Sequence, residues 1–106
     1  AKYGMSLYAL GMAEEFRGRV AVNALWPRTV IQTAALNLLG GEETARQGRT
    51  AEIVADAAHV ILTKDFKACT GNFFLDEDLL RAEGVTDFER YAVEKGRALL
   101  PDFFLD

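Results

Sequence analysis

Apolar residues recur at helical spacing in the first part of the chain. Between residues 2 and 17 one stripe contains Met5, Tyr8, Ala9, Met12 and Phe16. A second apolar group on another side of the same segment contains Tyr3, Leu7 and Leu10. This pattern predicts a helix that is apolar over most of its circumference and lies between two surfaces. One surface is its own sheet, and the other is either more of its own chain or a second subunit.

A near-continuous apolar run at 19–26 follows Gly18, which ends the helix. Such a run is typical of a parallel strand that is buried on both faces. Pro27 ends this strand, and a short helical pattern follows at 30–39. The segment 39–49 has no periodicity and contains several glycines, which predicts a mobile loop.

The second half of the chain begins with a clear helical pattern at 50–64. Its inward stripe consists of Ile53, Val54, Ala57, Val60 and Ile61. A turn and a short apolar strand follow at 69–75, and Asp76 is suited to cap a small helix that ends at Gly84. The remaining residues, 85–106, form an aromatic tail without clear periodicity.

The order helix, strand, helices, strand, helix predicts an α/β fold with a parallel sheet. Two strands are too few for a finished sheet, because a parallel sheet needs neighbours on its edges and helices on both faces. The chain also begins in mid-helix, with no capping residue ahead of Ala1. We therefore expect that earlier residues belong to this protein, and that the 106 residues form one part of a single domain.

Composition excludes several classes of partner. The chain is 50% hydrophobic and 26% charged, with a net charge of −4 and no clustering of Lys and Arg. This predicts a globular protein that binds neither nucleic acid nor a membrane surface. The single cysteine, Cys69, cannot form an internal disulfide, which favours a reducing, cytoplasmic location.

The side chains most often found as metal ligands are sparse. His59 lies in the middle of a predicted helix, with no Cys, Asp or His at zinc-binding spacing. Cys69 has no histidine nearby in the sequence and is expected to pack as a small apolar residue. We therefore expect no metal site.

An ordered set of residues resembles the carboxyl-terminal half of the short-chain dehydrogenase/reductase family. The set consists of Lys2, Asn23, Pro27, Val30, Thr33, Thr70 and Gly71. The family has a Tyr-x-x-x-Lys motif on a long helix, an Asn-x-x-x-Pro-Gly-x-Val/Ile-x-Thr segment after the next strand, and a Thr-Gly pair before the last strand. Residues 71–77 and 101–106 look like its hydroxysteroid-dehydrogenase-like branch.

This resemblance implies a Rossmann-type doubly wound parallel sheet, of which residues 1–106 supply the carboxyl-terminal half of one domain. It also implies an oxidoreductase that transfers a hydride between NAD or NADP and an alcohol/carbonyl pair. Lys2 would bind the ribose of the nicotinamide nucleotide and lower the pKa of the family tyrosine from about 10. That tyrosine would lie four residues before Lys2, ahead of Ala1.

The same resemblance assigns roles to the corner after the first strand. Pro27 would turn the backbone toward the nicotinamide, the amide of Val30 would meet its carboxamide, and the hydroxyl of Thr33 would reach the carboxamide or the pyrophosphate. Arg28 occupies the position where the family usually has glycine. Without the resemblance, the corner is a strand-to-helix turn with Thr29 as its N-cap.

Further expectations concern the substrate and assembly. The segment 34–49 corresponds to the family's variable substrate side, where Leu36, Leu38 and Leu39 either close over a small apolar alcohol or carbonyl compound or anchor a helix. The first helix commonly packs against its copy in this family, which implies a homodimer or homotetramer. The alternative to an enzyme is a non-catalytic interaction module that retains the fold, and Arg28 gives this reading some weight.

Overall fold

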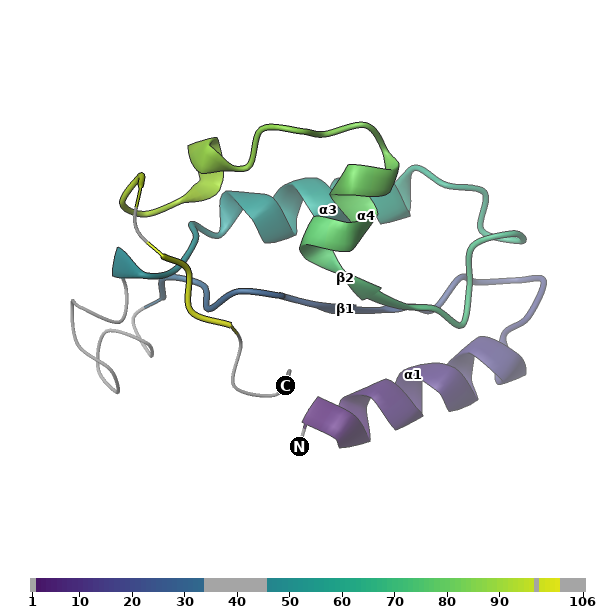
Figure 1. Ribbon diagram of the computed structural model, residues 1–106. Coiled ribbons are helices and arrows are strands. Elements are labelled where there is room, and N and C mark those ends of the chain that lie inside the picture. The colour runs from purple at the N-terminus through teal and green to yellow at the C-terminus, as the bar shows by residue number, and fades with distance from the viewer. Residues whose placement is uncertain (1, 34–45, 97, 102–106) are drawn as a thin grey trace.

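The computed structural model describes residues 2–33, 46–96 and 98–101, with side chains from residue 4 onward. Its elements are α1 (Lys2–Glu15), β1 (Ala24–Trp26), α3 (Glu52–Leu62), β2 (Phe73–Leu75), α4 (Asp76–Ala82) and a 3-10 helix (Glu89–Tyr91). They form three layers, with α1 on one face of the two strands and α3 and α4 on the other (Figure 1). This arrangement confirms the predicted α/β class.

The two strands pair in parallel, as predicted, with Ala24 opposite Phe73 and Trp26 opposite Leu75. β1 is shorter than the predicted 19–26 run. Residues 22 and 23, just before β1, lie opposite the turn that precedes β2. Here side-chain oxygens, as well as backbone carbonyls, accept the backbone amides. The amide of Val22 donates to Thr70 Oγ1 at 3.0 Å, and the amide of Asn72 donates to Asn23 Oδ1 at 3.0 Å.

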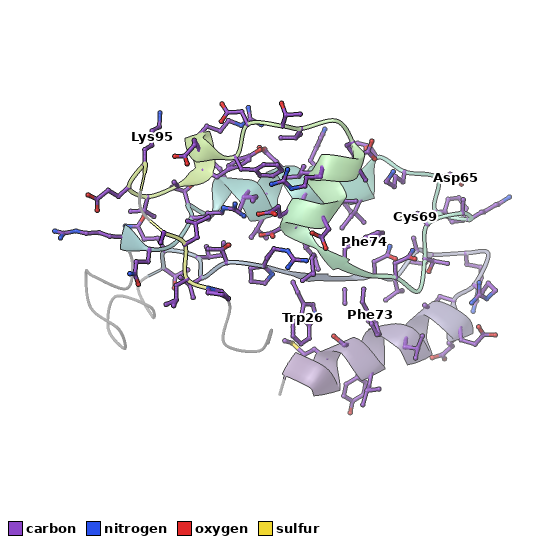
Figure 2. All side chains as sticks on the ribbon, viewed as in Figure 1. Trp26, Asp65, Cys69, Phe73, Phe74 and Lys95 are labelled. Carbon is purple, nitrogen blue, oxygen red and sulfur yellow. The ribbon has the colours of Figure 1, made fainter. Side chains whose placement is uncertain are left out.

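Alternate strand residues face opposite layers. Phe74 and Leu25 pack against the main core, whose buried members are Ile53, Ala57, Leu79, Leu80, Phe88 and Tyr91. Trp26 and Phe73 project toward α1 (Figure 2). The strand pair is thus covered on both faces, as the near-continuous apolar sequence of a parallel strand requires.

The buried face of α1 shares Ala9 with the predicted stripe but not Met5, Tyr8 or Met12. Ser6, Ala9 and Ala13 are buried, whereas Met5 and Tyr8 are 64% and 73% exposed. Met12, Leu7 and Leu10 are exposed as well. Small side chains let the helix approach the strands closely, and a Cβ added at Gly71 would lie 3.6 Å from the Cβ of Ala13. The periodicity identified the helix correctly, but it identified the buried side only in part, through Ala9.

The described part of the predicted helix at 30–39 is extended instead. Thr29 forms a bridge with Pro101, and Ile31 forms one with Arg49. Thr29 is therefore not a helix N-cap. The remaining residues of this predicted helix, including Leu36, Leu38 and Leu39, lie outside the described part.

The end of the predicted mobile loop is also firmly held. Arg49 is buried and donates its amide to Val30 O at 2.9 Å, while Gly48 O accepts the amide of Val93. The amide of Leu100 donates to Gln47 O at 2.8 Å. Long-range backbone bonds to the predicted tail therefore fix residues 47–49, a cause that local sequence does not reveal. Residues 34–45 lie outside the described part.

The small helix after β2 begins one residue earlier than predicted. Asp76 is the first residue of α4, and Leu75 is its N-cap. The helix ends as expected near Gly84, whose φ of 97° suits a residue without a Cβ. Asp76 Oδ1 accepts the amide of Glu77 at 2.7 Å, so the carboxylate still satisfies one amide at the start of the helix.

Candidate functional site

The carboxyl ends of β1 and β2 lie at the same edge of the strand pair, because the strands are parallel. Pro27 and Arg28 follow β1, and Asp76 follows β2. The amide of Arg28 donates to Asp76 Oδ1 at 3.0 Å, so the two strand ends are tied together. We call residues 27–33 the corner. In open α/β sheets, ligands bind in the crevice outside this edge.

The side chain of Arg28 is held on α4. Its Nε lies 3.2 Å from Asp78 Oδ1, and its Nη2 lies 2.7 Å from Asp78 Oδ2. The hydrogen bond to Asp78 raises the pKa of Arg28 further above its usual value. Both side chains are largely exposed, so the pair adds little stability. The pair does, however, determine where the Arg28 side chain points. It binds the guanidinium to α4, at the position where the family usually has glycine.

The backbone amide of Val30 is one of the groups that the resemblance places against the nicotinamide. Val30 is buried beside Leu100, and its amide donates to Leu100 O at 3.0 Å. This amide is therefore already paired in the structure. Six positions separate Pro27 from Thr33, one more than in the family pattern, so Ile31 rather than Val30 has the Val/Ile-x-Thr spacing.

The first turn of α1 lies beside the carboxyl end of β1 (Figure 1). The indole Nε1 of Trp26 donates to Ser6 Oγ at 2.9 Å, and Ser6 is only 5% exposed. Lys2 precedes Ser6 by four residues, so the two positions share one helix face. The side chain of Lys2 is outside the described part, but its turn is brought to the same edge as the corner. Sequence reasoning did not anticipate Ser6.

Asp76 is the most buried charged group at this edge, with 0% exposure. Burial raises the pKa of its carboxyl, and the bonds from the amides of Arg28 and Glu77 partly oppose that rise. Its Oδ2 is buried without a hydrogen-bond partner. The signal that could have found it is an acidic residue directly after an apolar strand. The sequence pattern alone suits Asp76 only to the role of helix cap.

The two acidic residues after Asp76 hold other segments. Glu77 Oε1 lies 2.7 Å from Nη1 of the buried Arg49, and Glu77 Oε2 lies 3.3 Å from Nε of Arg81. Burial tends to raise the pKa of Glu77, but the two arginines lower it overall. The guanidinium groups of both arginines also contact the Phe88 ring. The first turn of α4 therefore joins the corner to residues 47–50.

The opposite, amino-terminal edge has a structural polar cluster. Asn23 donates through Nδ2 to Cys69 O at 3.0 Å and accepts from Asn72. Asn23 thus lies at the far end of the strand from the corner, as a strand-end residue. Cys69 is a half-buried free thiol. In the part of the chain that the structure describes, no group of His, Cys, Asp and Glu side chains could hold a metal ion.

Comparison with known proteins identifies similar sequences over the whole chain. It is 62% identical over 106 residues to hydroxysteroid dehydrogenase-like protein 2 of Danio rerio and 57% identical to the Homo sapiens protein of that name. All of this chain is covered in both matches, but only 25% of each relative. The chain thus spans about a quarter of the length of these relatives. No protein-family model matches it.

Solved structures agree with this finding. A candidate dehydrogenase from Xanthomonas campestris matches 97% of this chain with a TM-score of 0.87 and 51% identity. A short-chain dehydrogenase from Mycobacterium thermoresistibile matches 98% with a TM-score of 0.85 and 48% identity. Each match covers 38% of the other chain. Among the described residues, none of the helices is long and apolar enough to span a membrane. The predicted resemblance is confirmed: in sequence and fold this chain is similar to part of solved short-chain dehydrogenases and to part of hydroxysteroid dehydrogenase-like protein 2.

Proposed function

We propose that the complete protein is an NAD- or NADP-dependent oxidoreductase acting on an alcohol/carbonyl pair, and that residues 1–106 form the carboxyl-terminal half of its catalytic domain. The observation that carries the proposal is the edge where the first turn of α1, the corner and Asp76 meet. The similarity to short-chain dehydrogenases supports a nicotinamide cofactor in general. A small apolar substrate and a cytoplasmic location remain proposals from the resemblance and from the single cysteine.

The corner fits a cofactor better than its sequence suggested. A side chain at position 28 would obstruct a close approach to the backbone if it projected into the crevice. Asp78 binds the guanidinium on α4 instead. The amide of Ile31 makes no hydrogen bond within the described residues, so it is a better candidate than Val30 to donate to the carboxamide. Thr33, two residues further along the chain, would supply a hydroxyl.

The chemistry divides between the cofactor and this chain. A bound nicotinamide supplies or accepts the hydride. Lys2 would hold the ribose hydroxyls, and its ammonium would favour the phenolate of a tyrosine four residues earlier. That phenolate would exchange a proton with the substrate oxygen. Pro27, Arg28 and the residues up to Thr33 would orient the nicotinamide and shield one of its faces from water.

Assembly is a second part of the proposal. Leu7 and Leu10 on α1 are 67% and 50% exposed, and a shallow groove beside them is lined by Gly4, Gly11 and Met12. An apolar helix face of this kind suits an isologous contact with a second copy. We therefore propose a homodimer or homotetramer in which α1 packs against its copy.

The test is Lys2→Met in the complete protein, with Lys67→Met as the control. Lys67 lies in the turn before β2, at the other edge of the strands. Removing an ammonium that binds ribose should weaken cofactor binding roughly tenfold to a hundredfold and lower kcat, without lowering the melting temperature. The control should leave both unchanged. Full turnover and unchanged cofactor affinity in Lys2→Met would refute the role of Lys2. Absence of cofactor binding by the wild type would favour the non-catalytic interaction module.

A further inference from the structure

The buried carboxylate of Asp76 has no assigned role in the chemistry described above. It is fully buried at the carboxyl edge of the strand pair, yet it is not paired with a cation by hydrogen bonds. A buried charge without such a partner is costly, so its position calls for a reason. Its two hydrogen bonds supply one, because they come from backbone amides of two different segments.

We propose that Asp76 is a positioning residue that fixes the corner for nicotinamide binding, through the single oxygen that accepts the amides of Arg28 and Glu77. This inference rests on the proposed function. The bond from Arg28 is 3.0 Å long and the bond from Glu77 is 2.7 Å long. One oxygen therefore joins the backbone after β1 to the first turn of α4.

The placement of this bond determines what it controls. Arg28 directly follows Pro27, which lacks an amide hydrogen, so the Arg28 N–H is the first donor after β1. Fixing that donor fixes where the backbone leaves the strand. Residues 29–31 then enter the bridges with Pro101 and Arg49 in one register. The candidate donors of the corner depend on this register.

Asp78 assists from the same helix. Its carboxylate binds the Arg28 side chain, while Asp76 binds the Arg28 backbone. The two contacts differ in strength. The pair with Asp78 is exposed and screened by solvent, whereas the bond to Asp76 is buried. Asp76 therefore positions the backbone of the corner, whereas Asp78 only orients the side chain of Arg28.

The experiment compares two replacements of similar size in the complete protein. Asp76→Leu removes the acceptor, and Asp76→Asn keeps an oxygen in the same place. Asp65→Leu is the matched control, because Asp65 Oδ1 also accepts a backbone amide, that of Lys67, but in an exposed turn at the other edge. NADH and NADPH affinities are measured by fluorescence titration, and amide hydrogen exchange is measured at Arg28.

Asp76→Leu should weaken cofactor binding about tenfold and speed exchange at Arg28 by a similar factor, since a bond to a charged acceptor is lost. Asp76→Asn should bind within about threefold of the wild type, as should Asp65→Leu. Wild-type affinity in Asp76→Leu would overturn the proposal. So would equal weakening in Asp76→Asn and Asp76→Leu, because the acceptor would then be irrelevant.

Two further measurements keep the outcome decisive. If circular dichroism shows Asp76→Leu to be unfolded, Asp76→Ser replaces it, because its shorter side chain can cap Glu77 but does not reach Arg28. Folded Asp76→Ser with wild-type affinity would overturn the proposal. If the wild type binds neither cofactor, the proposed function fails. In that case the amide hydrogen exchange of Arg28 alone tests whether Asp76 fixes the corner: faster exchange in Asp76→Leu supports this, and unchanged exchange overturns it.

Discussion

The buried pair Arg49 and Glu77 should respond unequally to loss of either partner. The side chain of Arg49 is 4% exposed and that of Glu77 is 16% exposed. Breaking a buried pair by removing one partner costs about 3–5 kcal/mol. Arg49→Met leaves Glu77 beside Arg81, whose Nε lies 3.3 Å from Glu77 Oε2. We therefore expect a cost near the lower value, about 3 kcal/mol.

Glu77→Gln has the larger expected cost, about 5 kcal/mol, because it isolates a buried guanidinium. Arg49 Nε has no hydrogen-bond partner, and the Phe88 ring, 5.5 Å from Arg49 Cζ, would not replace the lost carboxylate. The double variant should cost less than the sum of the two. Urea unfolding of the complete protein, followed by far-UV circular dichroism, gives all three values.

The pH dependence adds a second check on this pair. Burial tends to raise the pKa of Glu77, but Arg49 and Arg81 outweigh this effect and lower the pKa below its ordinary value of 4.5. A lowered pKa stabilises the folded state above the unfolded value, and this contribution is lost as pH falls through the folded pKa. The cost of Glu77→Gln should therefore shrink on acidification below about pH 4.5. A cost for Arg49→Met that equals or exceeds that for Glu77→Gln would refute the reasoning.

Three further predictions concern the edge and α1. Ser6→Ala should lower the unfolding free energy by about 1–3 kcal/mol, because the Trp26 indole loses its bond to Ser6. Ser6→Thr should retain the bond, and equal melting temperatures for the wild type and Ser6→Ala would count against it. Burial raises the pKa of Asp76, so its contribution is present below the unfolded value and is lost as pH rises through the folded pKa. Asp76→Asn should accordingly gain stability relative to the wild type as pH rises above about 4, and a pH-independent difference would contradict this. Leu7→Asp should increase the monomer fraction in sedimentation, whereas an unchanged oligomer would exclude Leu7 from the contact.

The sequence was sufficient for the elements whose patterns are local. The helices at 2–17 and 50–64, the parallel strands and the end near Gly84 all followed from periodicity and from breaking residues. The buried side of α1 was not predictable in this way. Ser6, Ala9 and Ala13 are not the most apolar residues of the helix, and they are buried because their size permits close packing against the strands.

The corner shows a second limit. Residues 29–32 are extended because their backbone pairs with residues 49 and 100–101, which are distant in sequence. Local propensity carries no information on such pairing. The roles of Asp76 and Arg49 escaped prediction for the same reason, since each depends on a partner from another element. Lys2, Pro27, Arg28 and Thr33 came from the resemblance, and their roles in cofactor binding remain predictions.

The central claim is that this edge binds a nicotinamide cofactor. Calorimetric titration of the complete protein with NADH and with NADPH tests it most directly. We predict saturable binding of at least one of them, one molecule per chain, with a Kd in roughly the micromolar to millimolar range that is usual for enzyme ligands. Lys2→Met should weaken it. Absence of binding of either cofactor by the folded wild-type protein would contradict the account.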